Sequence, residues 1–173
     1  GSPIGDTPPL MIALGATLHL RGADGPRTLP LEDFFIEYGK QDLRPGEFVE
    51  AIVLPRPAPG TILAAHKVSK RKYEDISSVC GAFSIVLDGD VVHSARVVFG
   101  GMAGTPKRAN HLEAAISGIH WSEAAITPLL DVLEEDYKPM TDHRASAEYR
   151  ALVAKNMVRR VVIDHPVLRE AAE

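Results

Sequence analysis

The sequence predicts an α+β fold in which antiparallel strands are followed by helices. A turn with the sequence Asp88-Gly-Asp90 joins two apolar runs, a pattern typical of a β-hairpin. In the last third of the chain, apolar residues recur every three or four positions, which indicates amphipathic helices. Three prolines within residues 55–59 interrupt any regular element, so we expect the chain to divide there into two parts.

The part before these prolines predicts a short helix, a hairpin, one turn of helix and a strand. Thr7 can cap the short helix, Pro8 suits its first turn and Gly15 stops it. We expect the helix at residues 7–14, the hairpin strands at 17–21 and 27–29, the helical turn at 31–36, a polar loop at 38–46 and the strand at 48–54.

The part after the prolines predicts three strands and then three helices. Thr105 with Pro106 suits the start of the first helix, Ser122 suits the cap of the second, and Asp142 and Ser146 are alternative caps for the third. We expect the strands at residues 61–69, 78–88 and 91–99, and the helices at 106–117, from 122, and at 145–163. The inward faces would carry Ile126, Leu129, Leu130 and Leu133 in the second helix, and Tyr149, Leu152, Val153, Met157 and Val161 in the third.

Composition narrows the class of protein. With 45% hydrophobic and 24% charged residues, the 173-residue chain can bury a real core, and its net charge of −4 argues against nucleic-acid binding through bulk electrostatics. Cys80 is the only cysteine, which excludes an intrachain disulfide, a Cys-rich zinc site and a four-Cys iron–sulfur cluster, and fits a reducing cytoplasm. The sequence has no long apolar run or signal segment, so we expect neither membrane insertion nor export.

The most unusual stretch is residues 67–81, which begins basic, turns acidic and ends apolar. Its charged members are Lys67, Lys70, Arg71, Lys72, Glu74 and Asp75. Such a cluster between two strands can place a small anionic ligand or a polar ring. A solvated connection between the strands is the commoner explanation of a charge run. Cys80, between two apolar neighbours, is expected to be a small buried hydrophobe.

Other candidate sites carry weaker signals. The seven histidines lack the H-x-x-x-H spacing that favours zinc on a helix. Gly100-Gly-Met-Ala-Gly104 lies between a strand and a helix, where phosphate loops occur, but a tight turn explains it more simply. Residues 2–6 could hold a polar ligand or only cap the helix that follows. The chain has no G-x-S-x-G motif and no Cys–His pair that would indicate nucleophilic catalysis.

Seven motifs in a defined order are more specific than any one of these signals. They are Ser2-Pro-Ile-Gly-Asp6, Leu29-Pro-Leu-Glu-Asp-Phe-Phe35, Gly46-Glu-Phe-Val49, Lys67-Val-Ser-Lys-Arg71, Asp75-Ile-Ser-Ser-Val79, Phe99-Gly-Gly-Met-Ala103 and Arg144-Ala-Ser-Ala-Glu-Tyr-Arg150. Together they resemble the FAD-carrying subunit of bacterial xanthine dehydrogenase, in the molybdenum hydroxylase family, which also contains CO dehydrogenase. The resemblance covers nearly the whole chain.

The resemblance implies a domain organisation. Residues 1–55 would be the C-terminal remainder of an FAD-binding domain, and residues 60–173 a domain of the CO dehydrogenase flavoprotein C-terminal type, with a three-stranded antiparallel sheet and about three helices. In the family, an iron–sulfur domain and the first half of the FAD domain precede the stretch that matches residues 2–6, so we expect those segments to be missing partners of this one.

It also implies cofactor contacts. In the family, the residues matching Ser2 and Asp6 contact FAD, and the apolar pair matching Phe48 and Val49 packs near the isoalloxazine ring. The lysine matching Lys67 reaches the flavin. An ammonium group there would stabilise the negative charge that builds on a reduced flavin. At roughly 4 Å and an effective dielectric constant of about 20, such a charge is worth about 4 kcal/mol before desolvation.

A second cofactor is implied beside the first. Arg71, Glu74 and Asp75 fall where the family has a basic–acidic loop beside the flavin face used by NAD. Two departures bear on these contacts. Gly5 stands where some relatives have a hydroxyl residue, and the sequence of residues 72–75 leaves NAD or another acceptor open.

The implied function is electron transfer in an oxidoreductase of purine metabolism. Electrons from a molybdenum cofactor on a molybdopterin-binding large subunit would pass through [2Fe-2S] clusters to FAD and then to NAD, and this segment alone would be inactive, with no catalytic residue of its own. Two alternatives stay open. The segment could be a structural docking module that uses residues 106–163, or it could belong to a CO or aromatic-substrate dehydrogenase.

Overall fold

The structure, a computed structural model, describes residues 4–167 and confirms the α+β class. Its elements are α1 (Thr7–Ala13), β1 (Thr17–Gly22), β2 (Gly25–Pro30), α2 (Leu31–Phe34), β3 (Phe35–Glu37), β4 (Lys40–Gln41), β5 (Phe48–Val53), β6 (Ile62–Val68), β7 (Val79–Asp88), β8 (Val91–Gly100), β9 (Lys107–Arg108), α3 (Asn110–Ile116), α4 (Glu123–Ile126), the 3-10 helix η1 (Thr127–Val132), α5 (Leu133–Asp136) and α6 (Ala147–Asp164). Within the described residues, no helix is both long and apolar enough to cross a membrane.

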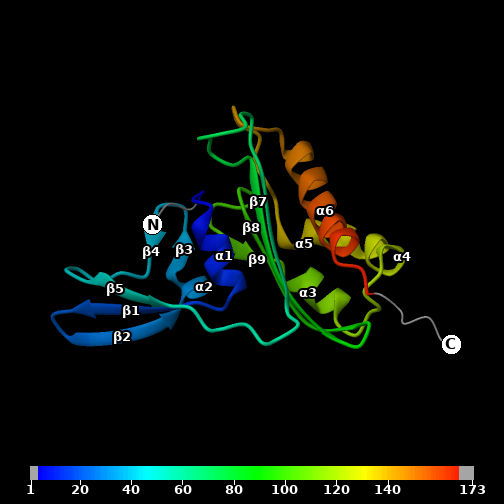
Figure 1. Cartoon of the computed structure of the whole chain (residues 1–173). Helices are drawn as coiled ribbons and strands as arrows, with labels where there is room; N and C mark the ends of the chain where they lie inside the picture. Colours follow the sequence, from blue (N-terminus) through cyan, green and yellow to red (C-terminus); the bar gives the residue numbers. More distant parts are fainter. Residues whose placement is uncertain (1–3, 168–173) are drawn as a thin grey trace.

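The largest sheet has its antiparallel strands in the order β6-β7-β8-β9. Strands β7 and β8 have ten residues each and meet at the predicted turn, where Gly89 has a φ of 60°. Figure 1 shows α1 against one face of this sheet and α3 and α6 on the other. The predicted hairpin is therefore the centre of the molecule.

A second sheet, in the order β2-β1-β5, extends to the side of the first (Figure 1). Its central strand β1 buries Leu18 and Leu20 on one face, as the alternation of its sequence predicts. These leucines share an apolar cluster with Ile12 of α1 and with Ala82 and Val98 of the large sheet. One hydrophobic cluster therefore spans both sides of the proline-rich segment.

Arg96 of β8 fixes α1 on the large sheet. Its Nε and Nη2 donate to the carbonyl oxygen of Ile12 at 3.0 and 2.7 Å. Its Nη2 also donates to Glu32 of α2 at 2.6 Å, and Glu32 in turn lies 3.3 Å from Arg108 of β9. These groups are partly buried, so they connect the last turn of α1 and the start of α2 to the sheet through charge-assisted hydrogen bonds.

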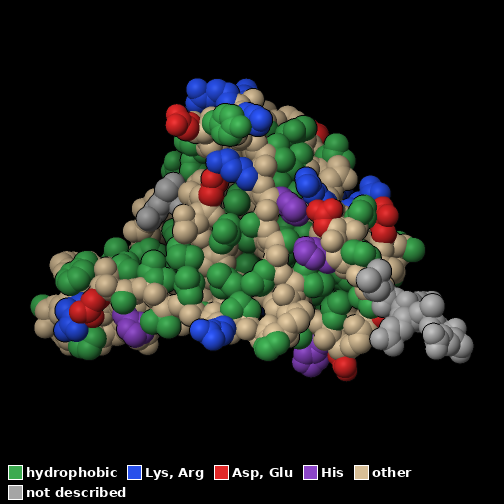
Figure 2. Space-filling view, viewed as in Figure 1, with side chains coloured by type: hydrophobic (Ala, Val, Ile, Leu, Met, Phe, Trp, Pro, Cys, Tyr) green, Lys and Arg blue, Asp and Glu red, His purple; other side chains and the backbone are tan. Residues whose placement is uncertain are grey.

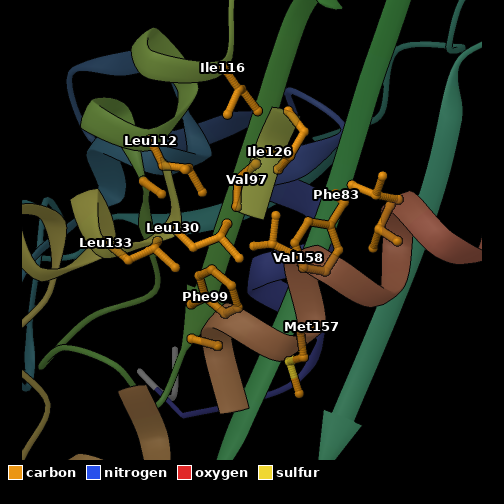
Figure 3. Close-up of a cluster of buried hydrophobic side chains, with 14 of the residues drawn as sticks. Phe83, Val97, Phe99, Leu112, Ile116, Ile126, Leu130, Leu133, Met157 and Val158 are labelled. Carbon is orange, nitrogen blue, oxygen red and sulfur yellow. The ribbon is translucent and has the colours of Figure 1, made fainter. Parts of the chain in front are cut away.

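The main core lies between the large sheet and the C-terminal helices (Figure 3). The rings of Phe83 and Phe99 meet edge to face with centroids 5.7 Å apart, and Phe99 meets Tyr137 in the same way at 5.7 Å. Leu112 of α3 and Val158 of α6 pack into the same cluster. The helices predicted from apolar spacing thus cover this face of the sheet.

The first helix after the sheet starts later than predicted. Thr105 and Pro106 do not open it, because the next two residues form β9 and pair with Val98 and Phe99 at the end of β8. Helix α3 instead begins at Asn110. Its cap is distant in sequence: the carboxylate of Asp136 accepts hydrogen bonds at 3.0 and 3.1 Å from two backbone N–H groups of its first turn.

The second predicted helix is divided into three pieces. Ser122 does cap it, because its side chain accepts from a backbone N–H at 3.3 Å. Pro128 then brings no N–H to the helix, and the backbone tightens into η1 between α4 and α5. The predicted inward face is confirmed, with Ile126, Leu130 and Leu133 buried and Leu129 partly buried against the core.

The third helix has the predicted cap, and its predicted inward face is confirmed at Val153, Met157 and Val161. Ser146 caps α6 by accepting from Tyr149 N at 3.2 Å, so the alternative cap Asp142 is not used. Tyr149 and Leu152 point outward, 47% and 57% exposed, contrary to the prediction. The buried line instead begins with Arg150, at 3% exposure. Its buried members are Arg150, Ala154, Met157, Val158, Val161 and Val162, and Val153 is partly buried.

The first part also departs locally from the prediction. Helix α1 already includes Thr7, so Asp6 and not Thr7 holds the capping position, and Asp6 makes no side-chain hydrogen bond to the helix. The helical turn expected at 31–36 ends at Phe34, and a short hairpin of β3 and β4 extends from there into the predicted polar loop. Both departures arise in stretches where prolines or glycines weaken the local pattern.

Gly101 is expected to tolerate no side chain, since its φ is 81° and a Cβ there would overlap the carbonyl oxygen of Ser78. We expect Gly101→Ala to lower the free energy of unfolding by about 1–3 kcal/mol more than Gly89→Ala. Gly89 is the matched control because its φ is 60° and its Cβ would meet nothing within 4 Å. Urea unfolding of both variants measures the difference, and equal losses would contradict it.

Candidate functional site

Lys67, near the end of β6, is the centre of the candidate site. Its Nζ donates to Asp6 Oδ2 at 2.6 Å and to the carbonyl oxygen of Asp75 at 2.6 Å. Asp6 lies 61 residues earlier in the chain, immediately before α1, and Asp75 lies in the connection to β7. The structure therefore brings together three of the residues that the sequence predicted for a cofactor site.

Asp6 is held on both of its carboxylate oxygens. Its Oδ1 accepts a hydrogen bond from Ser77 Oγ, while Oδ2 faces Lys67. The Cys80 thiol lies 3.8 Å from the backbone carbonyl of Asp6. The side chains of Asp6 and Lys67 are each 40% exposed, whereas Ser77 is 4% exposed. The ion pair is therefore accessible to solvent, while Asp6 is also held by a buried hydroxyl.

Asp75 closes the turn that carries the basic residues. Its two oxygens accept from the backbone N–H groups of Arg71 and Ile76, each at 3.0 Å. The hydrogen bond from the Arg71 backbone is the main reason that the pKa of the Asp75 carboxyl is lowered. Arg71 itself is 74% exposed, and Glu74 has a positive φ of 50°. The turn thus holds its backbone by Asp75 and presents its cationic side chain to solvent.

The basic side chains of this turn dominate one end of the molecule. Figure 2 shows Lys and Arg side chains gathered over the β6–β7 connection at the top of the view. Lys70 of this connection donates to the carbonyl of His143, and Lys72 lies 5.1 Å from the ring centroid of Tyr73. Positive charge is therefore concentrated on the β6–β7 connection, although the net charge of the chain is −4.

Cys80 is buried, as predicted. Burial raises the pKa of its thiol to about 11, and the nearby charge of Asp6 adds to that effect. The thiol is therefore protonated at neutral pH and is not an activated nucleophile.

Phe48 and Val49 lie on a different sheet from Lys67. They begin β5, opposite Arg21 and Leu20 of β1, and are 55% and 38% exposed. Every residue of β5 is exposed. The structure thus leaves this pair outside the hydrogen-bonded cluster around Lys67. Ser2, the seventh predicted cofactor residue, lies outside the described residues.

Two features of this region were not predicted from the sequence. Ser77 was quoted as part of a motif but given no role. A cavity of about 340 Å³ lies next to it, with Ile4, Tyr38, Gly101, Met140 and Arg150 among its lining residues. Its walls come from segments far apart in the sequence, so no single motif could have revealed it. Among residues 4–167, no group of three or more His, Cys, Asp and Glu is placed to hold a metal ion.

Arg150 organises the wall of this cavity from inside the protein. Its guanidinium donates to the carbonyls of Ser78 and Gly101, the latter at 2.8 Å, and to Asp142 Oδ1 at 2.7 Å. The glycine motif at residues 100–104 is therefore a turn held by a buried arginine, and the next regular element is β9. The interpretation of this motif as a tight turn from a strand into a helix is therefore correct for the strand β8 before it and wrong for the element after it.

The Asp142 carboxylate makes the stability of the fold depend on pH in the acid range. Burial alone would raise the pKa of its carboxyl, but hydrogen bonds from Arg144 N, Arg150 and Ala145 N outweigh burial and lower the pKa to about 2. A lowered pKa contributes stability above the unfolded value of about 3.8, and this contribution is lost as pH falls through about 2.

We therefore expect Asp142→Asn to be less stable than the parent at pH 7 and the two to converge near pH 2 in urea unfolding. A constant difference from pH 7 to pH 2 would contradict this assignment.

Two family models match the chain on either side of the proline-rich segment. Residues 1–57 match the FAD binding domain in molybdopterin dehydrogenase, and residues 64–164 match the CO dehydrogenase flavoprotein C-terminal domain. The second match alone covers more than half of the chain.

Curated relatives agree with these matches. The chain is 31% identical to the carbon monoxide dehydrogenase medium chain of Afipia carboxidovorans over 162 residues, which are 94% of this chain and 56% of that protein. It is 31% identical to xanthine dehydrogenase of Oryza sativa subsp. japonica over 140 residues, which are 78% of this chain and 10% of that protein. The chain therefore spans about half the length of the first relative and about a tenth of the second.

A solved structure shows the same fold. Carbon monoxide dehydrogenase from Hydrogenophaga pseudoflava, in a form that lacks the Mo-pyranopterin moiety of the molybdenum cofactor, superposes with a TM-score of 0.86 at 32% identity, over 92% of this chain and 55% of that chain. Fold and matches together define an FAD-binding flavoprotein segment. The chain belongs to the FAD-carrying subunits of the molybdenum hydroxylase family, which include those of the xanthine and CO dehydrogenases.

Proposed function

We propose that this chain forms one wall of an FAD site in an oxidoreductase of the molybdenum hydroxylase family. Electrons would reach that FAD from molybdenum and iron–sulfur centres elsewhere in the complex, which includes a molybdopterin-binding large subunit. The observation that carries the proposal is the convergence of Asp6, Lys67 and Asp75 from separate segments at a partly exposed position. The family matches on both sides of residue 60 support it.

The donor set at Lys67 fits a flavin. An ammonium group has three N–H donors, and the two hydrogen bonds that Lys67 makes with described residues leave one for a further acceptor. The isoalloxazine ring offers carbonyl and ring-nitrogen acceptors along its edge. Bound FAD would supply the electron-carrier chemistry, and the protein would supply position and charge. We propose Phe48, Val49 and Ser2 as further contacts, completed by residues outside this sequence.

Lys67 acts here as half of an ion pair. The Asp6 carboxylate at 2.6 Å offsets much of its charge, and both side chains are 40% exposed, so water screens the remainder. The expected effect on a flavin is therefore well below the value of about 4 kcal/mol for a lone charge at 4 Å. Lys67 would still favour the reduced state of the flavin, because the N–H that its two hydrogen bonds leave would donate to a ring acceptor that becomes more negative on reduction.

We expect Lys67→Ala to lower the FAD midpoint potential by about 5–20 mV, the equivalent of about 0.2–1 kcal/mol for a two-electron couple. The measurement is a redox titration of FAD-loaded flavoprotein that contains these residues. Lys70→Ala is the matched control, because Lys70 lies on the same connection but bonds to His143. An unchanged potential in Lys67→Ala, with FAD still bound, would sink the assigned role of Lys67.

We propose NAD as the electron acceptor, approaching the turn at residues 71–75. The support is the exposed guanidinium of Arg71, which suits the pyrophosphate of a dinucleotide. Arg71→Ala should slow reoxidation of the reduced flavin by NAD about two- to fivefold in stopped flow, with Lys40→Ala, in the β3-β4 hairpin, as a control. If a quinone or dye reoxidises the flavin and NAD does not, another acceptor is used, while the FAD site itself stands.

The substrate of the whole enzyme is a separate proposal. Xanthine oxidation is supported by the xanthine dehydrogenase relative, and CO oxidation is supported equally by the CO dehydrogenase medium chain and its solved counterpart. The large subunit that copurifies with this chain decides between them. A role in purine metabolism would follow only from the first, and a location in the cytoplasm stays a prediction from the sequence. The docking-module alternative predicts that Lys67→Ala and Asp6→Asn leave FAD affinity unchanged in the assembled flavoprotein.

A further inference from the structure

The carboxylate of Asp6 does not cap α1, because two prolines take the places of the N–H donors that it would bind. A residue at the capping position of a helix normally accepts hydrogen bonds from the backbone N–H groups at the second and third helical positions. In α1 these positions are Pro8 and Pro9, which have no N–H. Asp6 accordingly makes no side-chain hydrogen bond to its own helix. Its carboxylate is directed to Ser77 and Lys67 instead.

Ser77 is the buried end of a row of three polar groups. Its hydroxyl donates to Asp6 Oδ1, and the opposite oxygen of Asp6 accepts from the ammonium group of Lys67 at 2.6 Å. Ser77 is 4% exposed, whereas the side chains of the other two are 40% exposed. The row therefore runs from the protein interior to the surface, and only its inner end is immobilised by packing.

We propose that Ser77 is a positioning residue for the flavin site. Its hydroxyl selects one orientation of the Asp6 carboxylate, and that carboxylate places the Lys67 ammonium group where a ligand can use its remaining N–H. This inference rests on the proposed FAD function. It assigns to Ser77 an effect on the cofactor that acts only through Asp6 and Lys67.

The neighbouring serine offers a matched control. Ser78 is also buried, at 2% exposure, but its hydroxyl donates to the backbone carbonyl of Arg144 at 3.2 Å and not to Asp6. Removing either hydroxyl deletes one buried hydrogen bond. Only the change at Ser77 disturbs the row that ends at Lys67.

The test compares Ser77→Ala, Ser77→Thr, Ser77→Cys and Ser78→Ala in FAD-loaded flavoprotein that contains these residues. We expect Ser77→Ala to weaken FAD binding about two- to tenfold, the loss expected for one hydrogen bond. We expect its FAD potential to shift in the same direction as in Lys67→Ala and by less. Ser77→Thr keeps the hydroxyl and should restore both values, since the cavity of about 340 Å³ beside Ser77 can take a methyl group. Ser78→Ala should match the parent in both.

Ser77→Cys covers the case in which alanine impairs folding, because it keeps the volume and weakens the donor. It should behave as Ser77→Ala in FAD affinity and potential. A second measurement uses the 173-residue chain without FAD. In urea unfolding, Ser77→Ala and Asp6→Ala should be non-additive, because each removes the hydrogen bond from Ser77 Oγ to the Asp6 carboxylate. Additive losses would contradict the proposed coupling.

The outcomes separate this inference from the proposed function. If Lys67→Ala shifts the potential while Ser77→Ala and Ser77→Cys leave FAD affinity and potential at the parent values, Ser77 has no positioning role and the flavin site stands. If Ser78→Ala has the same effect as Ser77→Ala, the effect is general loss of packing, and the inference is overturned. If Lys67→Ala also changes neither value, the proposed function itself fails.

Discussion

The contact of Arg96 with the last turn of α1 is the constraint on which the candidate site depends. Two donors from one guanidinium hold the carbonyl of Ile12, and Glu32 neutralises the same group. A charge-assisted hydrogen bond of this kind is typically worth about 1.5–3 kcal/mol. Because the C-terminal end of α1 is fixed on β8, its N-terminal end is fixed over the start of β7. Asp6 can then meet Ser77 and Lys67, which come from the other side of the proline-rich segment.

The strands were predictable because their signals are local. The turn at Gly89 and the alternation along β1 each lie within a few residues of the structure they specify. The start of α3 was not predictable in this way, since its capping carboxylate, Asp136, lies at the far end of α5. The inward face of α6 was predicted only in its later turns, because its first buried residue is Arg150, a polar side chain that apolar spacing places on the outside.

The candidate site was predicted by resemblance and not by local pattern. No periodicity connects Asp6 with Lys67, which are 61 residues apart. The ordered motifs supplied that connection, and the structure brings the two together at 2.6 Å. The motif comparison gave no role to Ser77, because a serine next to a second serine just before a strand carries no chemical signal of its own. Its distinction from Ser78 is a matter of which way each hydroxyl points, and that follows from the tertiary fold.

The two prolines of α1 have a consequence for how this protein can vary. In most helices a capping aspartate serves local stability, so its replacement damages the fold and the site together. Here the first turn has no donors for such a side chain to satisfy, and the helix is indifferent to the identity of its capping residue. Position 6 therefore acts on the electrostatic environment at Lys67 without taking part in the capping of α1. Mutation there can retune cofactor chemistry at the cost of the hydrogen bonds with Ser77 and Lys67, while the helix itself keeps its stability.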